Sequence, residues 1–250
     1  MNGKLQWRIK AFFDYWRRRC DFICNLDFKE HNHEANVLLW AHFDALSSLW
    51  VQNIAKKQYG KKGKRIIFDA FLANYGGELF QIVSLPHLWN RIDKEDVCVN
   101  RKNNQKLPRD VCTFLSKIGE RQTPTRINQY QLRQGSADWN LKTIIAETLQ
   151  RYPETNPTEL EEWLTLSRYG AIAYKEMRSA YIHEGRAGKS THGFDLYESE
   201  KRPTYFSGVY TTPPTIGFQV EFMLSVLEKC INAFEANALE LQQDPVPEEQ

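Results

Sequence analysis

The chain has 250 residues, which is enough for one large domain or two small ones. A net charge of +2 excludes a strongly basic nucleic-acid-binding protein, while 42% hydrophobic and 13% aromatic residues suffice for a sizeable core. No apolar run approaches the ~18 residues that a transmembrane helix needs, and the basic N-terminus lacks the apolar centre of a signal peptide. We therefore expect a cytoplasmic protein that does not contact membranes.

The five cysteines are odd in number and scattered, a pattern typical of reduced thiols in a cytosolic protein. Two of them, Cys20 and Cys24, lie shortly before His31, His33 and Glu34. This spacing fits no standard zinc pattern, and only two thiols are local. A surface turn is the preferred interpretation, so we expect no metal and no other cofactor.

Helical periodicity runs through most of the chain, and period-two patterns are almost absent. The three longest helical patterns cover residues 33–58, 157–184 and 216–242. Shorter patterns cover residues 4–24, 66–75, 78–90, 110–118 and 138–151. Only Tyr205 to Thr211 resembles a strand. We predict an all-α fold, a helical bundle with long helices and loop insertions that forms a single domain over residues 1–243. An acidic, proline-containing tail over 244–250 is predicted to be disordered.

A basic segment follows the predicted helix 33–58. It runs from Lys56 to Arg65 and contains six basic residues and no acidic residue. Its spacing is not that of a Walker A loop. Lys61, Lys62, Lys64 and Arg65 stand beside glycines and a tyrosine, a composition that can hold the phosphates of RNA. A solvated turn between two helices explains the segment equally well.

The predicted helix 157–184 has clear ends. Asn156 can cap its first turn, in which Pro157 is well tolerated, and Gly185 suits the position just after its last turn. Its final residues bring together an arginine, a hydroxyl and a histidine: Arg178, Ser179 and His183.

The spacing of this motif has a geometric consequence. Arg178 and His183 are five residues apart, which at about 100° per residue places them roughly 140° apart around a regular helix. Holding one phosphate between them therefore needs a loosened last turn or a second copy of the helix. A long loop, residues 186–215, begins beside His183, carries Arg186 and could cover a site there.

Arg178, Ser179 and His183 on a late, long helix resemble the R-x4-6-H signature of the HEPN superfamily. The resemblance extends to the helical frame of residues 33–240. Ser179 stands where many members carry Asn, and Gly185 stands where HepT-type toxins carry Tyr. Members of the superfamily are typically all-α dimers, and many are metal-independent ribonucleases of toxin–antitoxin, phage-defence or CRISPR-linked systems. In these members, two such motifs meet across the dimer interface.

The resemblance implies a metal-independent endoribonuclease in a toxin or phage-defence context, leaving 2′,3′-cyclic phosphate ends. Arg178, His183 and Ser179 would be catalytic, and the basic segment together with Arg186 would bind RNA. The implied partners are a second copy, RNA, and an antitoxin or other defence-system protein.

Two other interpretations stay open. One is a non-catalytic helical dimer that binds RNA, a nucleotide or a partner protein. The other is a structural component of a defence assembly. In both, Arg178 would form an ion pair with Glu176, Glu184 or a neighbouring helix, and His183 would bond the last carbonyls of its own helix.

Overall fold

The computed structural model describes residues 3–94, 99–100, 105–119, 130–134, 138–192, 203–208 and 214–246. Helices predominate and the strands are short, which confirms the predicted mostly helical fold. The α-helices are α1 (Gly3–Cys24), α2 (Phe28–Asn53), α3 (Lys56–Tyr59), α4 (Lys64–Tyr75), α5 (Leu85–Lys94), α6 (Arg109–Leu115), α7 (Leu141–Arg151), α8 (Pro157–Thr165), α9 (Tyr169–Ala173), α10 (Ser179–Glu184) and α11 (Val220–Leu241). A 3₁₀ turn covers Glu78–Gln81 and a π-helical turn covers Tyr174–Arg178. The strands are β1 (Ile82–Val83), β2 (Val99–Asn100), β3 (Gln105–Lys106), β4 (Tyr130–Gln134), β5 (Trp139–Asn140), β6 (Thr204–Gly208) and β7 (Thr215–Gly217).

The chain divides into two compact units that interleave along the sequence. Unit 1 consists of Met1–Gly77, Ala173–Gly188 and Gln219–Gln250. Unit 2 consists of Glu78–Ile172 and Lys189–Phe218. From the sequence we predicted a single domain over residues 1–243, and no sequence pattern indicated this division.

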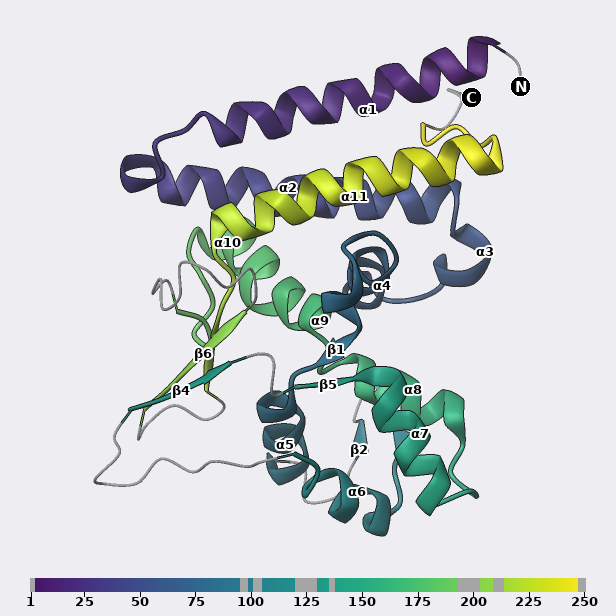
Figure 1. The fold of residues 1–250 in the computed structure, drawn as a ribbon, viewed down its shortest axis with the longest axis vertical. Coiled ribbons are helices and arrows are strands. Elements are labelled where there is room, and N and C mark those ends of the chain that lie inside the picture. Colours follow the sequence, from purple (N-terminus) through teal and green to yellow (C-terminus); the bar gives the residue numbers. More distant parts are fainter. Residues whose placement is uncertain are drawn as a thin grey trace. The chain divides into compact units, whose positions relative to one another are not determined.

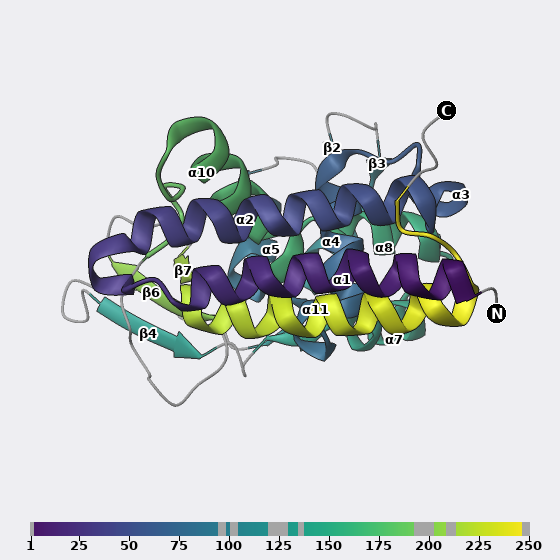
Figure 2. The ribbon, with the colours of Figure 1, turned by 90° about the horizontal axis from the view of Figure 1, so that it is seen from above.

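Unit 1 is built on three long helices, α1, α2 and α11, which lie side by side (Figures 1 and 2). The buried residues of α1 recur at steps of four and three, which places them on one face: Ile9, Phe13, Trp16, Cys20 and Ile23. That face packs against α11 and α2, and it confirms the predicted helix over residues 4–24.

Phe234 of α11 lies at the centre of this core. Its ring packs edge-on against Phe13 of α1, with centroids 5.1 Å apart, and stacks on Tyr75 of α4 at 5.3 Å. Phe71 approaches it edge-on at 5.8 Å. Aromatic pairs at these distances add to the stabilisation that burial alone provides. The N-terminal helix, α4 and the last helix therefore share one core.

The predicted helix over residues 157–184 is wrong as a continuous element. Asn156 caps α8 as expected, accepting from the amides of Thr158 and Glu159. The helix then ends at Thr165. Just beyond this end, the carbonyl of Ser167 leaves the helical pattern and accepts from the amide of Ser84 at 2.9 Å. The remaining part divides into α9, the π turn and α10, and ends at Gly185 in the left-handed conformation as predicted. The third long helix is α1 instead.

Two other predicted boundaries differ from the structure. The pattern at 78–90 is a 3₁₀ turn and β1, followed by α5, so Pro86 lies in the first turn of a helix rather than near its end. In the loop 186–215, β6 confirms the suggested pairing over Tyr205 to Gly208; residues 193–202 and 209–213 lie outside the described residues.

Unit 2 combines short helices with small antiparallel sheets. The strands β4, β6 and β7 form one sheet in that order, with Leu132 opposite Phe206 and Tyr205 opposite Ile216. The pair β1–β5 forms a second sheet and β2–β3 a third. The apolar cluster of unit 2 comes from α5, α6, α7 and α8 and includes Leu88, Trp89, Val111, Ile144 and Trp163.

A buried carboxylate, Asp138, joins several elements of unit 2. Its Oδ2 accepts from the hydroxyl of Tyr169 at 2.7 Å and lies in hydrogen-bond contact with the hydroxyl of Tyr205. Its Oδ1 accepts from the amide of Leu85 at 3.1 Å, which satisfies a donor at the start of α5. Complete burial, followed by the negative charge of Asp138, raises the pKa of Tyr205. This cluster ties α5, α9 and β6 to one another.

The first part of the predicted disordered tail is held in place. Asp244 forms an ion pair with Arg8 of α1 at 2.8 Å, and Asn53 donates to the carbonyl of Pro245 at 2.7 Å. The prediction of disorder is therefore wrong for residues 244–246, because side chains of α1 and α2 bind this segment. Residues 247–250 lie outside the described residues.

The cysteines are not all reduced. Cys20, Cys24 and Cys230 are free thiols, whereas Cys112 is disulfide-bonded, so the expectation of five reduced thiols is wrong at Cys112. None of the described helices combines the length and apolarity that a membrane crossing needs.

We predict that replacing Asp138 by Ala lowers the free energy of unfolding by about 3–5 kcal/mol, because buried donors lose their acceptor at roughly 1–3 kcal/mol each. Urea denaturation measures this loss. The control, Glu154→Ala, removes an exposed carboxylate of the same unit and should change stability by less than ~0.5 kcal/mol. A loss below about 1 kcal/mol in Asp138→Ala would contradict the assigned role of this carboxylate.

We also predict a loss of stability in mild acid that depends on His42. Its ring is buried edge-on against Trp16, and its Nδ1 contacts the carbonyl of Leu38. Burial lowers the pKa of His42. The unfolded chain therefore binds a proton more readily, and stability present above pH ~6.5 is lost as the pH falls. Denaturation midpoints between pH 7 and 5.5 measure this, and His42→Gln should flatten the slope; an unchanged slope would refute it.

Candidate functional site

The Arg178–His183 motif lies in unit 1, where the helix changes its winding. The π-helical turn Tyr174–Arg178 precedes α10, and the amide of Ser179 donates to the carbonyl of Tyr174, five residues back. Single π turns occur often at functional sites. The turn carries Glu176, Met177 and Arg178 into the interior of unit 1.

Arg178 is buried, with only 7% of the residue exposed. Its Nη2 donates to Oδ2 of Asp44 on α2 at 2.6 Å, a charge-assisted bond across two helices. The guanidinium also lies over the ring of Tyr174, 5.2 Å from its centroid. Its Nε is buried and has no hydrogen-bond partner among the described residues.

His183 is exposed at the surface end of this cluster. Its Nε2 lies 3.5 Å from Nη1 of Arg178, at the outer limit of a hydrogen bond in which the guanidinium donates to an unprotonated ring nitrogen. One chain therefore brings the two groups together. The argument that a 140° separation keeps the two groups apart within one chain is wrong here, because the two side chains converge to this distance.

Ser179 and Arg186 complete the motif region. Ser179 is half-buried beside Arg178. Arg186 is exposed and its guanidinium donates to Oε2 of Glu184 at 3.3 and 3.4 Å. Of the predicted site residues, Arg178, Ser179, His183 and Arg186 thus lie at one helix end.

A second set of charges lies on the buried side of the π turn. Arg65 at the start of α4 faces the carboxylates of Asp69 and Glu176, and burial lowers the pKa of Arg65. The amide of Gly188 donates to the carbonyl of Glu176 at 2.7 Å. A Cβ at position 188 would lie 2.6 Å from both that carbonyl and Oε2 of Glu176, so only glycine allows this approach. The chain leaving α10 is thereby tied back to the π turn.

The basic segment Lys56–Arg65 forms α3, a turn and the start of α4. Lys61, Lys62 and Lys64 are exposed, whereas Arg65 is half-buried against carboxylates. The ring of Tyr59 packs against Trp50, with centroids 5.2 Å apart, so it contributes to the core of unit 1. Three of the four predicted RNA-binding residues in this segment therefore face solvent and one does not.

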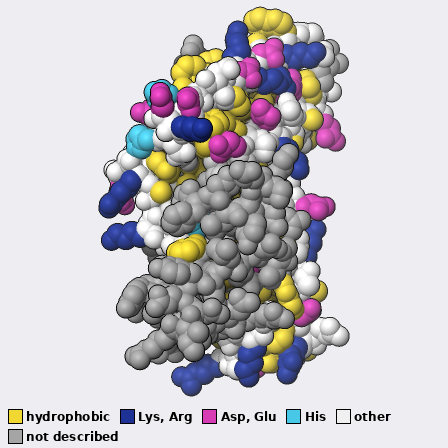
Figure 3. Space-filling view, turned by 60° about the vertical axis from the view of Figure 1, so that its left-hand side comes forward, with side chains coloured by type: hydrophobic (Ala, Val, Ile, Leu, Met, Phe, Trp, Pro, Cys, Tyr) yellow, Lys and Arg dark blue, Asp and Glu magenta, His cyan; other side chains and the backbone are white. Residues whose placement is uncertain are grey.

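The surface of unit 1 carries charges of both signs. On the face in Figure 3, basic and acidic side chains are interspersed over the described upper part of the molecule. This mixture agrees with the net charge of +2. Any affinity of unit 1 for a polyanion would have to come from a local cluster such as the three lysines.

Asp44 is the site residue that the sequence did not indicate. It lies on the predicted helix 33–58, where a polar residue between apolar positions looks like part of a solvated face. Its partner, Arg178, is 134 positions away in the sequence. The packing of the π turn against α2 places them together.

Comparison with known proteins adds no assignment. No family model, no curated protein and no solved structure matches this chain. The geometry of the site and the sequence motif are thus the basis for assigning a function.

We predict that the three exposed lysines and Arg65 respond differently to substitution. Lys61→Ala, Lys62→Ala and Lys64→Ala combined should leave stability unchanged and weaken RNA binding. The slope of the logarithm of the RNA-binding constant against the logarithm of the salt concentration should become shallower by up to about 0.7–0.9 for each phosphate contact that is lost. Arg65→Ala should instead destabilise the fold, because Asp69 and Glu176 lose a facing cation.

Filter binding at several salt concentrations and urea denaturation provide the two measurements. Unchanged affinity and slope in the triple variant would make the basic segment a solvated turn. Unchanged stability in Arg65→Ala would show that the buried carboxylates do not depend on this arginine.

Proposed function

We propose that this protein is a metal-independent endoribonuclease of the HEPN type, acting in a toxin or phage-defence context. The observation that supports the proposal is the approach of Arg178 Nη1 to His183 Nε2 at 3.5 Å. The histidine is exposed, and the guanidinium of Arg178 also donates to Asp44 through Nη2. This arrangement places an exposed acid–base group, His183, beside a buried phosphate-binding group, Arg178.

The chemistry follows from these two groups. His183 would take the proton from a ribose 2′-hydroxyl, whose oxygen attacks the adjacent phosphorus, or give a proton to the departing 5′-oxygen. Arg178 would stabilise the growing negative charge on the phosphorane oxygens. Ser179 could orient either group. Because the 2′-hydroxyl is the nucleophile, the products are a 2′,3′-cyclic phosphate and a 5′-hydroxyl, and DNA is not cleaved.

The ion pair with Asp44 need not be broken for this chemistry. A guanidinium has five N–H donors in a fixed fork. Nη2 bonds to Asp44, whereas Nη1 is directed toward His183 and Nε has no partner among the described residues. A phosphate oxygen could therefore bind on the His183 side while Asp44 keeps the guanidinium in place.

The second candidate is a non-catalytic helical dimer that binds RNA, a nucleotide or a partner protein. The burial of Arg178 and its 2.6 Å bond to Asp44 favour this function, since a buried, paired arginine can serve packing alone. The two candidates differ in whether RNA is cut.

The proposed partners are a second copy, RNA, and an antitoxin or other defence-system protein. The apolar surface for a dimer at this helix end is small. Met177 is 4% exposed and Tyr174 packs against Phe68, so both belong to the core of unit 1. Ile182 is 38% exposed, and Tyr181 is half-buried. A two-fold axis beside α10 would use these two residues.

We predict that Arg178→Ala and His183→Ala each abolish cleavage of labelled RNA in EDTA, because each removes a group that acts in the transition state. Arg18→Ala, which removes an exposed arginine of α1, is the control and should cleave as the wild type does. Circular dichroism must show that the fold is kept. Full activity in His183→Ala would end the proposed mechanism, and an RNA mobility shift without cleavage by the wild type would favour the second candidate.

Mixing the two inactive variants tests whether the active unit is a homodimer with shared sites. Partial recovery of cleavage would mean that Arg178 and His183 act across an interface. No recovery, with a dimer present, would mean that each chain carries its own complete pair, as the 3.5 Å approach within one chain allows.

A further inference from the structure

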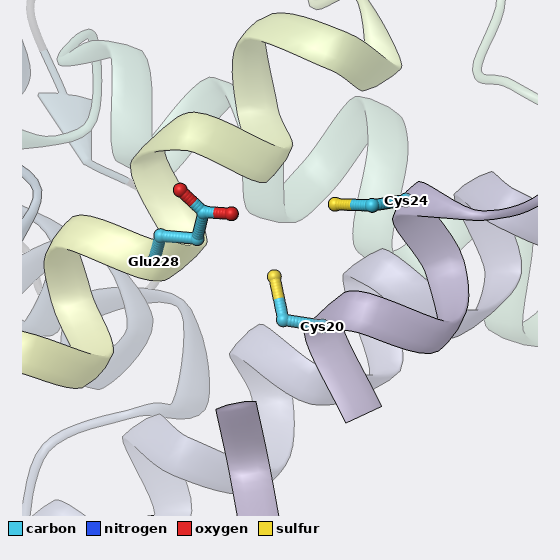
Figure 4. Close-up of side chains that lie close together, drawn as sticks. All are labelled: Cys20, Cys24 and Glu228. Carbon is cyan, nitrogen blue, oxygen red and sulfur yellow. The ribbon is translucent and has the colours of Figure 1, made fainter. Parts of the chain in front are cut away.

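Two cysteines and a glutamate converge where α1 packs against α11 in unit 1. Cys20 and Cys24 lie one helical turn apart at the end of α1, and Glu228 lies on α11. Their Sγ and carboxylate oxygen atoms all lie within 4.8 Å of one another. Figure 4 shows the two sulfur atoms and the carboxylate directed toward one common point.

We propose that Cys20, Cys24 and Glu228 bind a thiophilic divalent cation of the Zn²⁺ class, which joins α1 to α11. The set is separate from the Arg178–His183 motif and does not depend on the proposed nuclease function.

The size and type of the ligand set fit this class of ion. A tetrahedral zinc ion with ligand bonds of about 2.0–2.3 Å keeps its ligand atoms about 3.5–3.8 Å apart. Side-chain rotations of the three residues can close the remaining difference. Thiolate sulfur selects zinc-like and other soft ions over Mg²⁺ and Ca²⁺, which prefer oxygen alone.

The exposure of two of the three groups leaves room for a fourth ligand. Cys20 is 1% exposed, whereas Cys24 and Glu228 are exposed. A water molecule can therefore reach the outer side of the site. Three protein ligands and one water complete a tetrahedron of the kind that open zinc sites use.

The charges near the two thiols are negative. Burial, with smaller contributions from the negative charges of Glu228 and Asp21, raises the pKa of Cys20 to about 12 and also raises the pKa of Cys24. A bound cation would face Glu228 and replace the two thiol protons, so that one M²⁺ ion enters as two protons leave.

The third ligand was not predictable from the sequence. The two cysteines suggested a search among nearby residues, where His31, His33 and Glu34 fit no standard pattern. Glu228 comes from the far end of the chain and reaches the thiols only because α11 packs on α1.

The test is a titration of the reduced full-length protein with Co²⁺, which reports thiolate ligation through sulfur-to-cobalt charge-transfer absorption and tetrahedral geometry through intense d–d bands. We expect one Co²⁺ per chain, displacement by Zn²⁺, and a rise of Tm on adding Zn²⁺. Cys24→Ser should abolish the charge-transfer band of the bound ion or reduce it strongly. Glu228→Gln should weaken binding by at least the ~10–100-fold that loss of a supporting group costs.

Glu240→Gln, which changes another exposed carboxylate of α11, is the matched control and should bind as the wild type does. Cys24 and Glu228 are exposed, so their variants should fold, and circular dichroism checks this. Absence of a charge-transfer band in the wild type would overturn the proposal. So would equal binding by the wild type and Cys24→Ser, which would mean adventitious metal binding only.

Discussion

The burial of Arg178 is the constraint on which the candidate site depends. A guanidinium removed from water needs a counter-charge and acceptors, and Asp44 on α2 supplies both. This bond links the π turn to α2, and it decides which donors of the arginine remain for other groups. His183 reaches the guanidinium from the exposed side, so the ion pair also determines where the imidazole can act. The π turn brings Arg178 to this depth, and Gly188 closes the chain back onto the same turn.

Asp44 has two effects that oppose each other. It holds the guanidinium in one place, which favours catalysis because a positioned group needs no rearrangement during the reaction. It also competes with any phosphate for the positive charge of Arg178. A ligand that displaced Asp44 would leave this half-buried carboxylate without its counter-charge, which has an energetic cost. A phosphate that binds on the His183 side avoids this cost.

The sequence predicted what depends on local pattern and missed what depends on distant contacts. The helical period identified α1, α2 and α11, and the capping chemistry of Asn156 and Gly185 located both ends of the motif-bearing segment. The break after Thr165 was not visible, because it arises from a bond between Ser84 and Ser167. Asp44 and Glu228 were missed for the same reason: each is an ordinary polar residue on its own helix and gains a partner only through packing.

The order in which the two units share the chain has a consequence for synthesis on the ribosome. Unit 1 begins with residues 1–77 but needs α10 and α11, which follow most of unit 2 in the sequence. At about 5–20 residues per second, α11 emerges roughly 10–30 s after α4. During this interval Phe13 and Phe71 lack the ring of Phe234, so apolar surface of the nascent helices is exposed. Residues 78–172 are complete within that interval, and a chaperone that binds aromatic segments would find its target in the N-terminal helices.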